Sequence, residues 1–378
     1  MKQISSMDLY FLTKELQILE NQRIDNFYFE DDTFYLKIYI KTLGNIFLTN
    51  KVSKYIYIGN KKTDGSFPPN FIIFLRKHLK NGYIREIKQI EGERILTFKI
   101  DKKNQDEKIE SFYLIMELFA NGNIIICDEN FNIKNSLYKK KFKDRALMVN
   151  NVYELPPQKK LNIHNINTKI LREEISTSDL NLVKFLAIKF GMGGKYAEEV
   201  CNLSNIDKNK EIIKLDTKEI QNICKTLSDI KNKKITAYQV YKDNKIYDFL
   251  PFKFNSINLE QKKKSNFNET IKNYYKQFQI KKDKYEENLH KELERLQHRL
   301  ETQKEQKKQI LQDYEKYKEI GEKIYKNYST IDDLLKSINK AGKEKGWEDV
   351  QQTIKNNPQL SKLIAKLDYK NNEIVINL

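Results

Sequence analysis

The sequence is short of cysteine and of long apolar runs, and both shortages exclude classes of protein. Three cysteines occur in 378 residues, Cys127, Cys201 and Cys224, and none forms a CxxC pair. A disulfide framework or a zinc ribbon is therefore not expected. No run of about 18 apolar residues is present, so no membrane-spanning helix is expected. The N-terminus lacks the apolar stretch of a secretory signal, which makes a reducing cytoplasm the expected compartment.

Motifs that carry catalysis are also absent from the sequence. There is no GxSxG, no Walker A loop and no GxGxxG, and the four histidines show no HExxH or other ligand spacing. Carboxylates are plentiful, but no pair can be assigned to acid–base work without geometry. We therefore expect no catalytic residue, no metal, no cofactor and no enzymatic activity.

Arginine is scarce although the chain is strongly basic. Lysine and arginine total 69 against 52 acidic residues, a formal net charge of +17, yet only eight of the basic residues are arginine. A basic surplus favours a polyanionic partner, because neutralised phosphates release counterions. The chain is also rich in Lys, Ile, Asn and Tyr, so part of this surplus is compositional background. The arginines are more informative, because a guanidinium offers a rigid five-donor fork that lysine lacks.

The chain has enough apolar residues, 39% of the total, to build a folded core. Leu9, Leu12, Leu16 and Leu19 have helical spacing and predict a helix over residues 6–20, capped by Ser6 or Asp8. A second helix is predicted over residues 70–79. Strands are predicted over residues 24–29, 33–39, 55–58, 83–90, 94–100, 111–118, 124–127 and 131–137. Residues 1–160 are therefore expected to form an α+β domain with a mostly antiparallel sheet.

Composition divides the rest of the chain. A basic linker over residues 139–160 contains Pro156-Pro157, which indicates an extended crossing segment. Residues 161–257 are expected to be a helical domain, and residues 329–378 a small helical tip that ends in a strand-like segment. Between them, residues 258–328 predict a coiled-coil helix, because leucines 289, 293, 296 and 300 step by 4, 3 and 4. A helix of about 60 residues would be roughly 90 Å long and needs a partner for its apolar stripe.

The clearest local motif is Phe190-Gly191-Met192-Gly193-Gly194-Lys195. A helix ends, a glycine hairpin follows and a new helix begins, which is the helix-hairpin-helix pattern. Its backbone N–H groups and the next helix N-terminus can hold a phosphate without reading a base, and Lys195 would add charge. An ordinary tight helix connection, with Gly193 at positive φ, explains the same residues, and spacing alone favours that simpler interpretation.

Two other places offer candidate phosphate contacts. Arg76 and Lys77 lie beside the apolar stripe of the predicted helix over residues 70–79. They are either a solvated face, which is the simpler interpretation, or a phosphate contact. Glu93 and Arg94 follow Gly92 at a turn before a strand. They form either a local ion pair or an arginine that is steadied by an acid and directed at RNA.

Several segments follow one another in a recognisable order and spacing. The most specific are Leu75-Arg76-Lys77-His78-Leu79 and Asn121-Gly122-Asn123-Ile124-Ile125, and the supporting ones are residues 7–12, 44–57, 67–71, 92–95, 117–120 and 153–157. Together they resemble the NFACT family, the ribosome-associated quality-control factors that recruit tRNA to obstructed large subunits. The resemblance covers nearly the whole chain. It implies an N-terminal domain with the fold of formamidopyrimidine-type DNA glycosylases.

The resemblance also implies roles for particular residues. The family links an N-terminal Asp and an Asp-Arg pair to tRNA recruitment for C-terminal tailing. These correspond here to Asp8 and to Glu93-Arg94, where glutamate replaces the family's aspartate and adds one methylene. The glycosylases need a proline at the mature terminus as nucleophile, whereas Lys2 follows Met1 here, so glycosylase chemistry is not implied.

The family has a returning coiled-coil helix and a further RNA-binding domain, and neither is found before Leu378. The chain therefore resembles an N-terminal portion, and its lone long helix is expected to pair with another copy of itself.

The resemblance implies a non-enzymatic RNA-binding factor that binds the obstructed large ribosomal subunit with its peptidyl-tRNA and recruits tRNA for tailing of the nascent chain. Asp8, Glu93 and Arg94 are expected to grip the tRNA. Arg76 and Lys77 would lie on nearby phosphates, and the hairpin of Gly191, Gly193, Gly194 and Lys195 would meet its backbone. The competing hypotheses are a glycosylase or lyase acting on damaged DNA, a surface adhesin that binds fibronectin, and a coiled-coil scaffold whose charge is only compositional.

Overall fold

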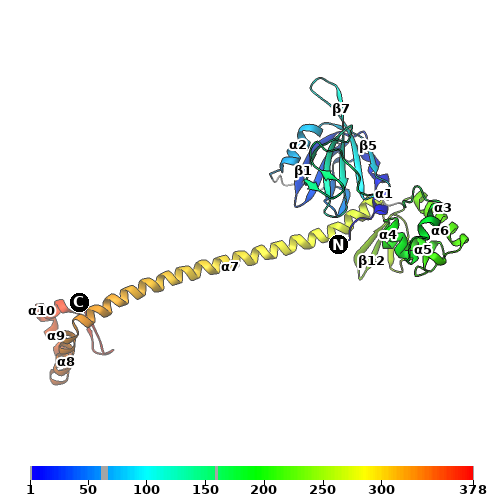
Figure 1. The fold of residues 1–378 in the computed structure, drawn as a ribbon. Helices are drawn as coiled ribbons and strands as arrows, with labels where there is room; N and C mark the ends of the chain where they lie inside the picture. The colour runs from blue at the N-terminus through cyan, green and yellow to red at the C-terminus, as the bar shows by residue number, and fades with distance from the viewer. Residues whose placement is uncertain (1, 61–66, 158–160, 378) are drawn as a thin grey trace. The chain divides into compact units, whose positions relative to one another are not determined.

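The computed structural model describes residues 2–60, 67–157 and 161–377. Its contacts divide the chain into two units, Met1–Lys282 and Asp283–Leu378 (Figure 1). Helix α7 (Phe267–Lys326) begins in the first unit and continues into the second. The boundaries expected near residues 160, 257 and 328 stay predictions.

Two antiparallel sheets form the N-terminal part of the first unit. The first holds β1 (Ile24–Glu30), β2 (Thr33–Ile40), β3 (Gly44–Lys51) and β4 (Tyr55–Gly59), and the second holds β5 (Tyr83–Gln89), β6 (Ile95–Lys103), β7 (Ile109–Glu117), β8 (Asn123–Asp128) and β9 (Ile133–Ser136), each in chain order. Side chains from both sheets, such as Leu48 and Phe98, are fully buried in one core. The mixed α+β class with antiparallel sheets is confirmed.

Strand β8 reads as a continuous apolar run because both of its faces are buried. Ile124 and Ile126 belong to the core between the sheets, whereas Ile125 and Cys127 pack on the opposite face, in a cluster that includes Tyr153. The chain after β9 folds back to cover that face, with β10 (Lys140–Lys141) and β11 (Ala146–Leu147) paired as a hairpin. This corrects the prediction of an extended linker over residues 139–160, of which residues 158–160 lie outside the described part.

Two helices accompany the sheets. Helix α1 (Ser6–Leu16) continues into the 3-10 turn η1 (Gln17–Leu19), and α2 (Asn70–Leu79) has the predicted bounds. The predicted caps of α1 are wrong by a residue or more, because Ser5 is the N-cap. Ser5 Oγ accepts from Asp8 N at 3.1 Å, and the Asp8 carboxylate accepts from Ser5 N at 3.0 Å, a reciprocal capping box.

The rest of the first unit combines helices with a third sheet. The helices are α3 (Thr168–Ile175), α4 (Leu182–Lys189), α5 (Gly194–Leu203) and α6 (Thr217–Asn232), with the 3-10 turn η2 (Ile212–Lys214). They are followed by β12 (Tyr238–Lys242), β13 (Lys245–Leu250) and β14 (Glu260–Lys263), in the order β13-β12-β14. The all-helical prediction for residues 161–257 is therefore wrong over the strands. Asp243 and Asn244 join β12 to β13 at positive φ, the backbone of a tight hairpin.

The long helix is confirmed, since α7 runs for 60 residues. Leu293 and Leu296 on its apolar stripe are 49% and 58% exposed, and pairing through this stripe stays a prediction. The second unit also holds α8 (Tyr328–Lys345), α9 (Trp347–Asn356), α10 (Pro358–Leu363) and the hairpin of β15 (Ile364–Asp368) and β16 (Glu373–Ile376). Within the described residues, no helix is long and apolar enough to cross a membrane.

Candidate nucleic-acid interface

The start of α1 joins two segments that the sequence singles out separately. Ser6 Oγ donates to the Gly191 carbonyl at 2.8 Å, in the glycine hairpin (residues 191–195). The amide of Gln89 donates to the carbonyls of Ser6 and of Glu93, both at 2.8 Å, and so holds the arginine turn (residues 92–94). The glycine hairpin and the arginine turn therefore lie at one junction, although about 100 residues separate them in the sequence.

Arg94 is half-buried at this junction, and its Nη1 donates to Gln3 Oε1 at 3.0 Å. Among the described residues, no ion pair joins it to Glu93, so the local ion pair, one of the two interpretations of these residues, is not formed. Burial lowers the pKa of the Arg94 guanidinium, and the Glu93 charge offsets part of that effect. Arginine stays protonated at neutral pH and has five N–H donors. The guanidinium therefore has more donors than the contact with Gln3 uses.

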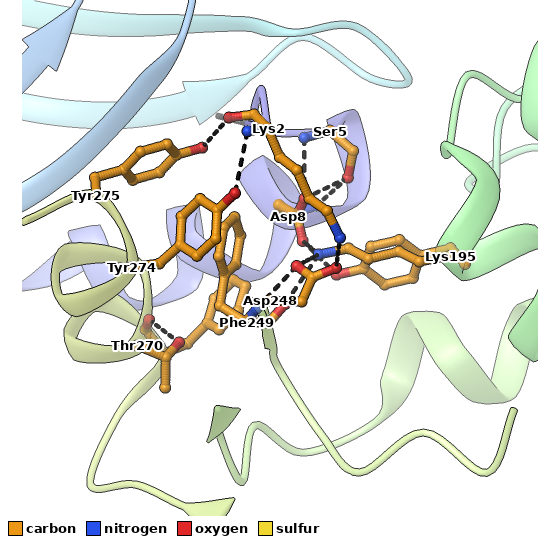
Figure 2. A network of polar contacts seen from close by, with 11 residues as sticks. Lys2, Ser5, Asp8, Lys195, Asp248, Phe249, Thr270, Tyr274 and Tyr275 are labelled. Atoms are coloured by element: carbon orange, nitrogen blue, oxygen red, sulfur yellow. Dashed lines mark hydrogen bonds and ion pairs between the residues drawn. The ribbon is translucent and has the colours of Figure 1, made fainter. Parts of the chain in front are cut away.

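A buried network of charges lies at the start of α1 (Figure 2). Lys195 Nζ is 2.9 Å from Asp8 Oδ1 and 3.3 Å from Asp248 Oδ1, and it donates to the Phe249 carbonyl at 2.9 Å. Lys2 Nζ is 2.5 Å from the other carboxylate oxygen of Asp248. Two lysines thus balance two aspartates, whose side chains are only 2% and 3% exposed. This pairing satisfies the need of buried charges for partners of opposite sign.

Each buried charge in this network is stabilised by the others. Burial alone would raise the pKa of Asp248, but Lys195 and Lys2 hold it below its usual value. Burial would lower the pKa of Lys195, and the charges of Asp248 and Asp8 outweigh burial and raise it. Tyr196 donates to Asp8 Oδ1 at 2.9 Å, and burial beside that carboxylate raises the tyrosine pKa well above its ordinary value.

These pKa shifts predict how stability depends on pH. The depressed pKa of Asp248 contributes stability above the ordinary aspartate pKa of about 4, and that contribution is lost as pH falls further. The raised pKa of Lys195 contributes stability up to about pH 10, which is lost at higher pH. We expect urea unfolding at several pH values to show that acid lowers the free energy of unfolding less in Asp248→Asn than in the wild type. The exposed control Asp106→Asn should keep the wild-type profile; equal profiles for all three proteins would contradict this prediction.

The N-terminal segment is also tied to the beginning of α7. Lys2 N donates to the Tyr274 hydroxyl at 3.1 Å, and the Tyr275 hydroxyl donates to the Lys2 carbonyl at 2.9 Å (Figure 2). The Glu15 carboxylate accepts from Phe267 N at 2.8 Å at the first residue of the long helix. Residues 2–15 therefore fix the arginine turn, the glycine hairpin and the root of α7 within one unit.

The structure places Asp8 and Lys195 differently from the expected direct contact with RNA. Asp8 is 1% exposed, and the Lys195 ammonium points inward to two carboxylates. The hairpin glycines form a tight turn before α5. Gly191 and Gly193 have φ of 64° and 82°, and α5 begins at Gly194. Positive φ at Gly193 fits both a phosphate-binding hairpin and a plain connection.

Arg76 and Lys77 are not part of this junction. Arg76 Nε and Nη2 both donate to the Phe27 carbonyl, at 2.9 and 2.7 Å, and the guanidinium lies 5.3 Å from the centre of the Tyr28 ring. These contacts hold α2 against β1. Lys77 is exposed on the same helix. The geometry favours the interpretation of Arg76 as a packing residue and Lys77 as part of a solvated face.

Several residues of the junction are missing from the sequence-based prediction, among them Lys2, Gln3, Gln89 and Asp248. Lys2 and Asp248 pair across 246 positions of the chain. No motif or periodicity relates residues so far apart, because only the folded chain brings β13 to the segment that precedes α1.

Two observations on the described residues concern metal binding and thiol chemistry. No group of three or more His, Cys, Asp or Glu among them is arranged to hold a metal ion. Burial raises the pKa of both Cys127 and Cys201 to about 12, which keeps these thiols protonated and weakly nucleophilic at neutral pH.

Comparison with known proteins agrees with this architecture. A family described as NFACT N-terminal and middle domains matches residues 5–374. The archaeal Rqc2 homolog aRqcH of Methanocaldococcus jannaschii is 30% identical over 398 residues, which cover 100% of this chain and 58% of that protein. Ribosome quality control complex subunit 2 of Saccharomyces cerevisiae is 34% identical over 139 residues, covering 35% of this chain and 13% of the relative.

A solved structure, the fibrinogen binding protein from Staphylococcus aureus, has a similar fold. Its TM-score is 0.60 at 21% identity, and the match covers 72% of this chain and 98% of that one. The expected likeness to the glycosylase fold stays a prediction. The chain spans little more than half the length of its archaeal relative.

Proposed function

Since the chain belongs to the NFACT family, we propose that it is a non-enzymatic RNA-binding factor of ribosome-associated quality control, at work in the cytoplasm. It binds the obstructed large ribosomal subunit carrying peptidyl-tRNA and recruits tRNA for C-terminal tailing of the stalled nascent chain. The names of the archaeal and yeast relatives support this role. Formation of the peptide bond belongs to the ribosome in this proposal.

The observation that carries the proposal is the junction of the arginine turn with the glycine hairpin at the start of α1. Arg94 offers guanidinium donors, and the hairpin offers backbone N–H groups at the N-terminus of α5. Both kinds of donor suit phosphate oxygens rather than base edges. A folded RNA spanning both would be held by its backbone, as expected for a factor that recognises tRNA mainly by shape.

In this proposal Asp8 and Lys195 act as positioning residues. Asp8 completes the capping box of α1 with Ser5 and pairs with Lys195, which immediately follows the hairpin glycines. The ion pair therefore fixes the glycine hairpin relative to the helix that also holds the arginine turn. Glu93 contributes its carbonyl to the Gln89 amide, a contact made by the backbone and not by the carboxylate.

The proposal is tested by binding of tRNA and of large subunits at several salt concentrations, with Arg94→Ala beside the matched control Arg85→Ala. Arg85 lies in the neighbouring strand β5, and its guanidinium pairs with Asp101 at 3.1 Å. Loss of one phosphate contact is expected to weaken tRNA binding by Arg94→Ala about tenfold and to reduce the slope of log affinity against log salt by about 0.7 to 0.9.

Arg85→Ala is expected to stay close to wild type. The proposal is wrong if the wild type binds no tRNA even at low salt, or if both arginine variants lose affinity equally.

A further inference from the structure

The first unit carries a basic cavity that neither the arginine turn nor the glycine hairpin lines. Its volume is about 320 Å³, and its lining residues are Asp32, Lys51, Val52, Ser53, Lys54, Asn121, Tyr138 and Lys140. Three lysines against one aspartate leave the lining with a positive balance. We name this cavity the basic pocket and propose that it binds the phosphate of a nucleotide.

The motif Asn121-Gly122-Asn123 shapes the basic pocket, and the proposed function assigns it no role. Gly122 adopts a φ of 65°, and a Cβ placed there would lie 2.4 Å from Ser53 N. The turn before β8 is therefore pressed directly against the turn between β3 and β4, which only glycine permits. These two turns bring Asn121 next to Lys51 and Lys54 at the cavity.

Asn123 fixes the segment that carries Tyr138 and Lys140, two lining residues of the basic pocket. Its side chain is buried, and it donates to the Tyr138 carbonyl at 2.8 Å and accepts from Tyr138 N at 3.0 Å. These two hydrogen bonds fix the backbone at residue 138, and both Tyr138 and Lys140 line the cavity. Lys140 Nζ lies 5.3 Å from the centre of that ring and 3.3 Å from the Gly122 carbonyl.

The chemistry of the lining indicates a ligand that combines an anionic group with a planar ring. Three ammonium groups attract a phosphate, and an amide and a hydroxyl, from Asn121 and Ser53, can complete its hydrogen bonds. A volume of about 320 Å³ exceeds what a bare phosphate fills and lies at the lower end of small-ligand sites. The Tyr138 ring supplies the kind of surface on which a base stacks.

The single acid in the lining is already engaged. Tyr138 donates its hydroxyl to Asp32 at 3.4 Å, and Lys51 Nζ is 4.0 Å from the same carboxylate. The Asp32 side chain is 72% exposed, so solvent screens its repulsion of an anion. Lys54 is exposed, and its carbonyl accepts from Ile4 N at 3.0 Å, which joins the basic pocket to the N-terminal segment.

The test measures binding of AMP, adenosine and inorganic phosphate to the full chain at low salt, in the wild type, Lys54→Gln and Lys54→Gln/Lys140→Gln. AMP is expected to bind saturably and phosphate to compete with it, whereas adenosine binds much more weakly. The double variant should lose about tenfold in AMP affinity and Lys54→Gln part of that loss. The matched control Lys80→Gln/Lys103→Gln removes the same charge from exposed positions outside the lining and should bind as the wild type does.

A tRNA arm identifies the source of the nucleotide. If tRNA displaces AMP, the pocket takes a nucleotide of the RNA chain; if it does not, the ligand is a free nucleotide. The inference is overturned if AMP does not bind up to about 1 mM, if adenosine binds as well as AMP, or if the control loses as much affinity as the double variant. None of these results depends on Arg94, so failure here is distinct from failure of the proposed tRNA function.

Discussion

Replacing Lys195 with methionine is expected to lower the free energy of unfolding of the first unit by about 3 kcal/mol. The substitution keeps much of the side-chain volume but removes the ammonium that lies between Asp8 and Asp248. Two carboxylates would remain buried with one fewer cation, and only Asp248 would keep a lysine partner, Lys2. A buried charge left without its partner costs far more than an exposed ion pair contributes.

Urea unfolding monitored by tyrosine fluorescence measures the loss, and a second substitution identifies its cause. Asp8→Asn in the Lys195→Met background removes the stranded charge while keeping an acceptor for Tyr196, so the double variant should be more stable than Lys195→Met alone. The exposed pair of Lys208 and Glu198, 3.0 Å apart, provides the control, since Lys208→Met should cost less than about 1 kcal/mol. Equal losses at Lys195 and Lys208 would show that burial of the network contributes nothing.

Replacing Gly122 with alanine is expected to lower the free energy of unfolding by about 3 kcal/mol. The substitution combines strain of the backbone with a steric overlap of the new Cβ. At a φ of 65° any other residue is strained, and its Cβ would lie 2.4 Å from Ser53 N and 2.7 Å from a Val52 methyl. Backbone atoms cannot move aside as a flexible side chain can, so the two turns would have to separate.

Gly44→Ala is the matched control for this substitution. Gly44 also has a positive φ, 71°, but a Cβ there would meet nothing within 4 Å. Its substitution should cost about 1 kcal/mol, the price of the left-handed backbone alone. The difference between the two variants in chemical unfolding isolates the overlap, and equal losses would mean that the turns relax without cost.

The sequence predicts most elements of the N-terminal sheets because their signals are local. Alternation in the second half of β2 and the uninterrupted apolar run of β8 both reflect which faces are buried. Helix α2 begins and ends where the sequence predicts. The hairpin of β12 and β13 is missing from the prediction, since its signal is only the Asp243-Asn244 turn between short strands. In such strands the side chains do not alternate clearly.

The candidate site is also predicted from the sequence only in part. Local sequence identifies Arg94 and the hairpin glycines as positions worth attention, and it gives no indication that Asp8 and Lys195 pair with each other. Neither composition nor spacing shows that Lys195 points inward, because a lysine beside a glycine hairpin reads equally well as a surface charge.

By itself, the sequence determined the basic charge, the antiparallel α+β class, the long helix and the likeness to NFACT proteins. These depend on composition, periodicity and short motifs, which each residue carries within its immediate neighbourhood. Only the tertiary structure decided which lysines and aspartates are buried together and that the turn of Arg94 lies beside the glycine hairpin. It also decided that the turn at Gly122 closes the basic pocket against Ser53. The physical reason is that burial and charge pairing depend on contacts between residues far apart in the chain, and these exist only once the sheets, helices and hairpins have packed.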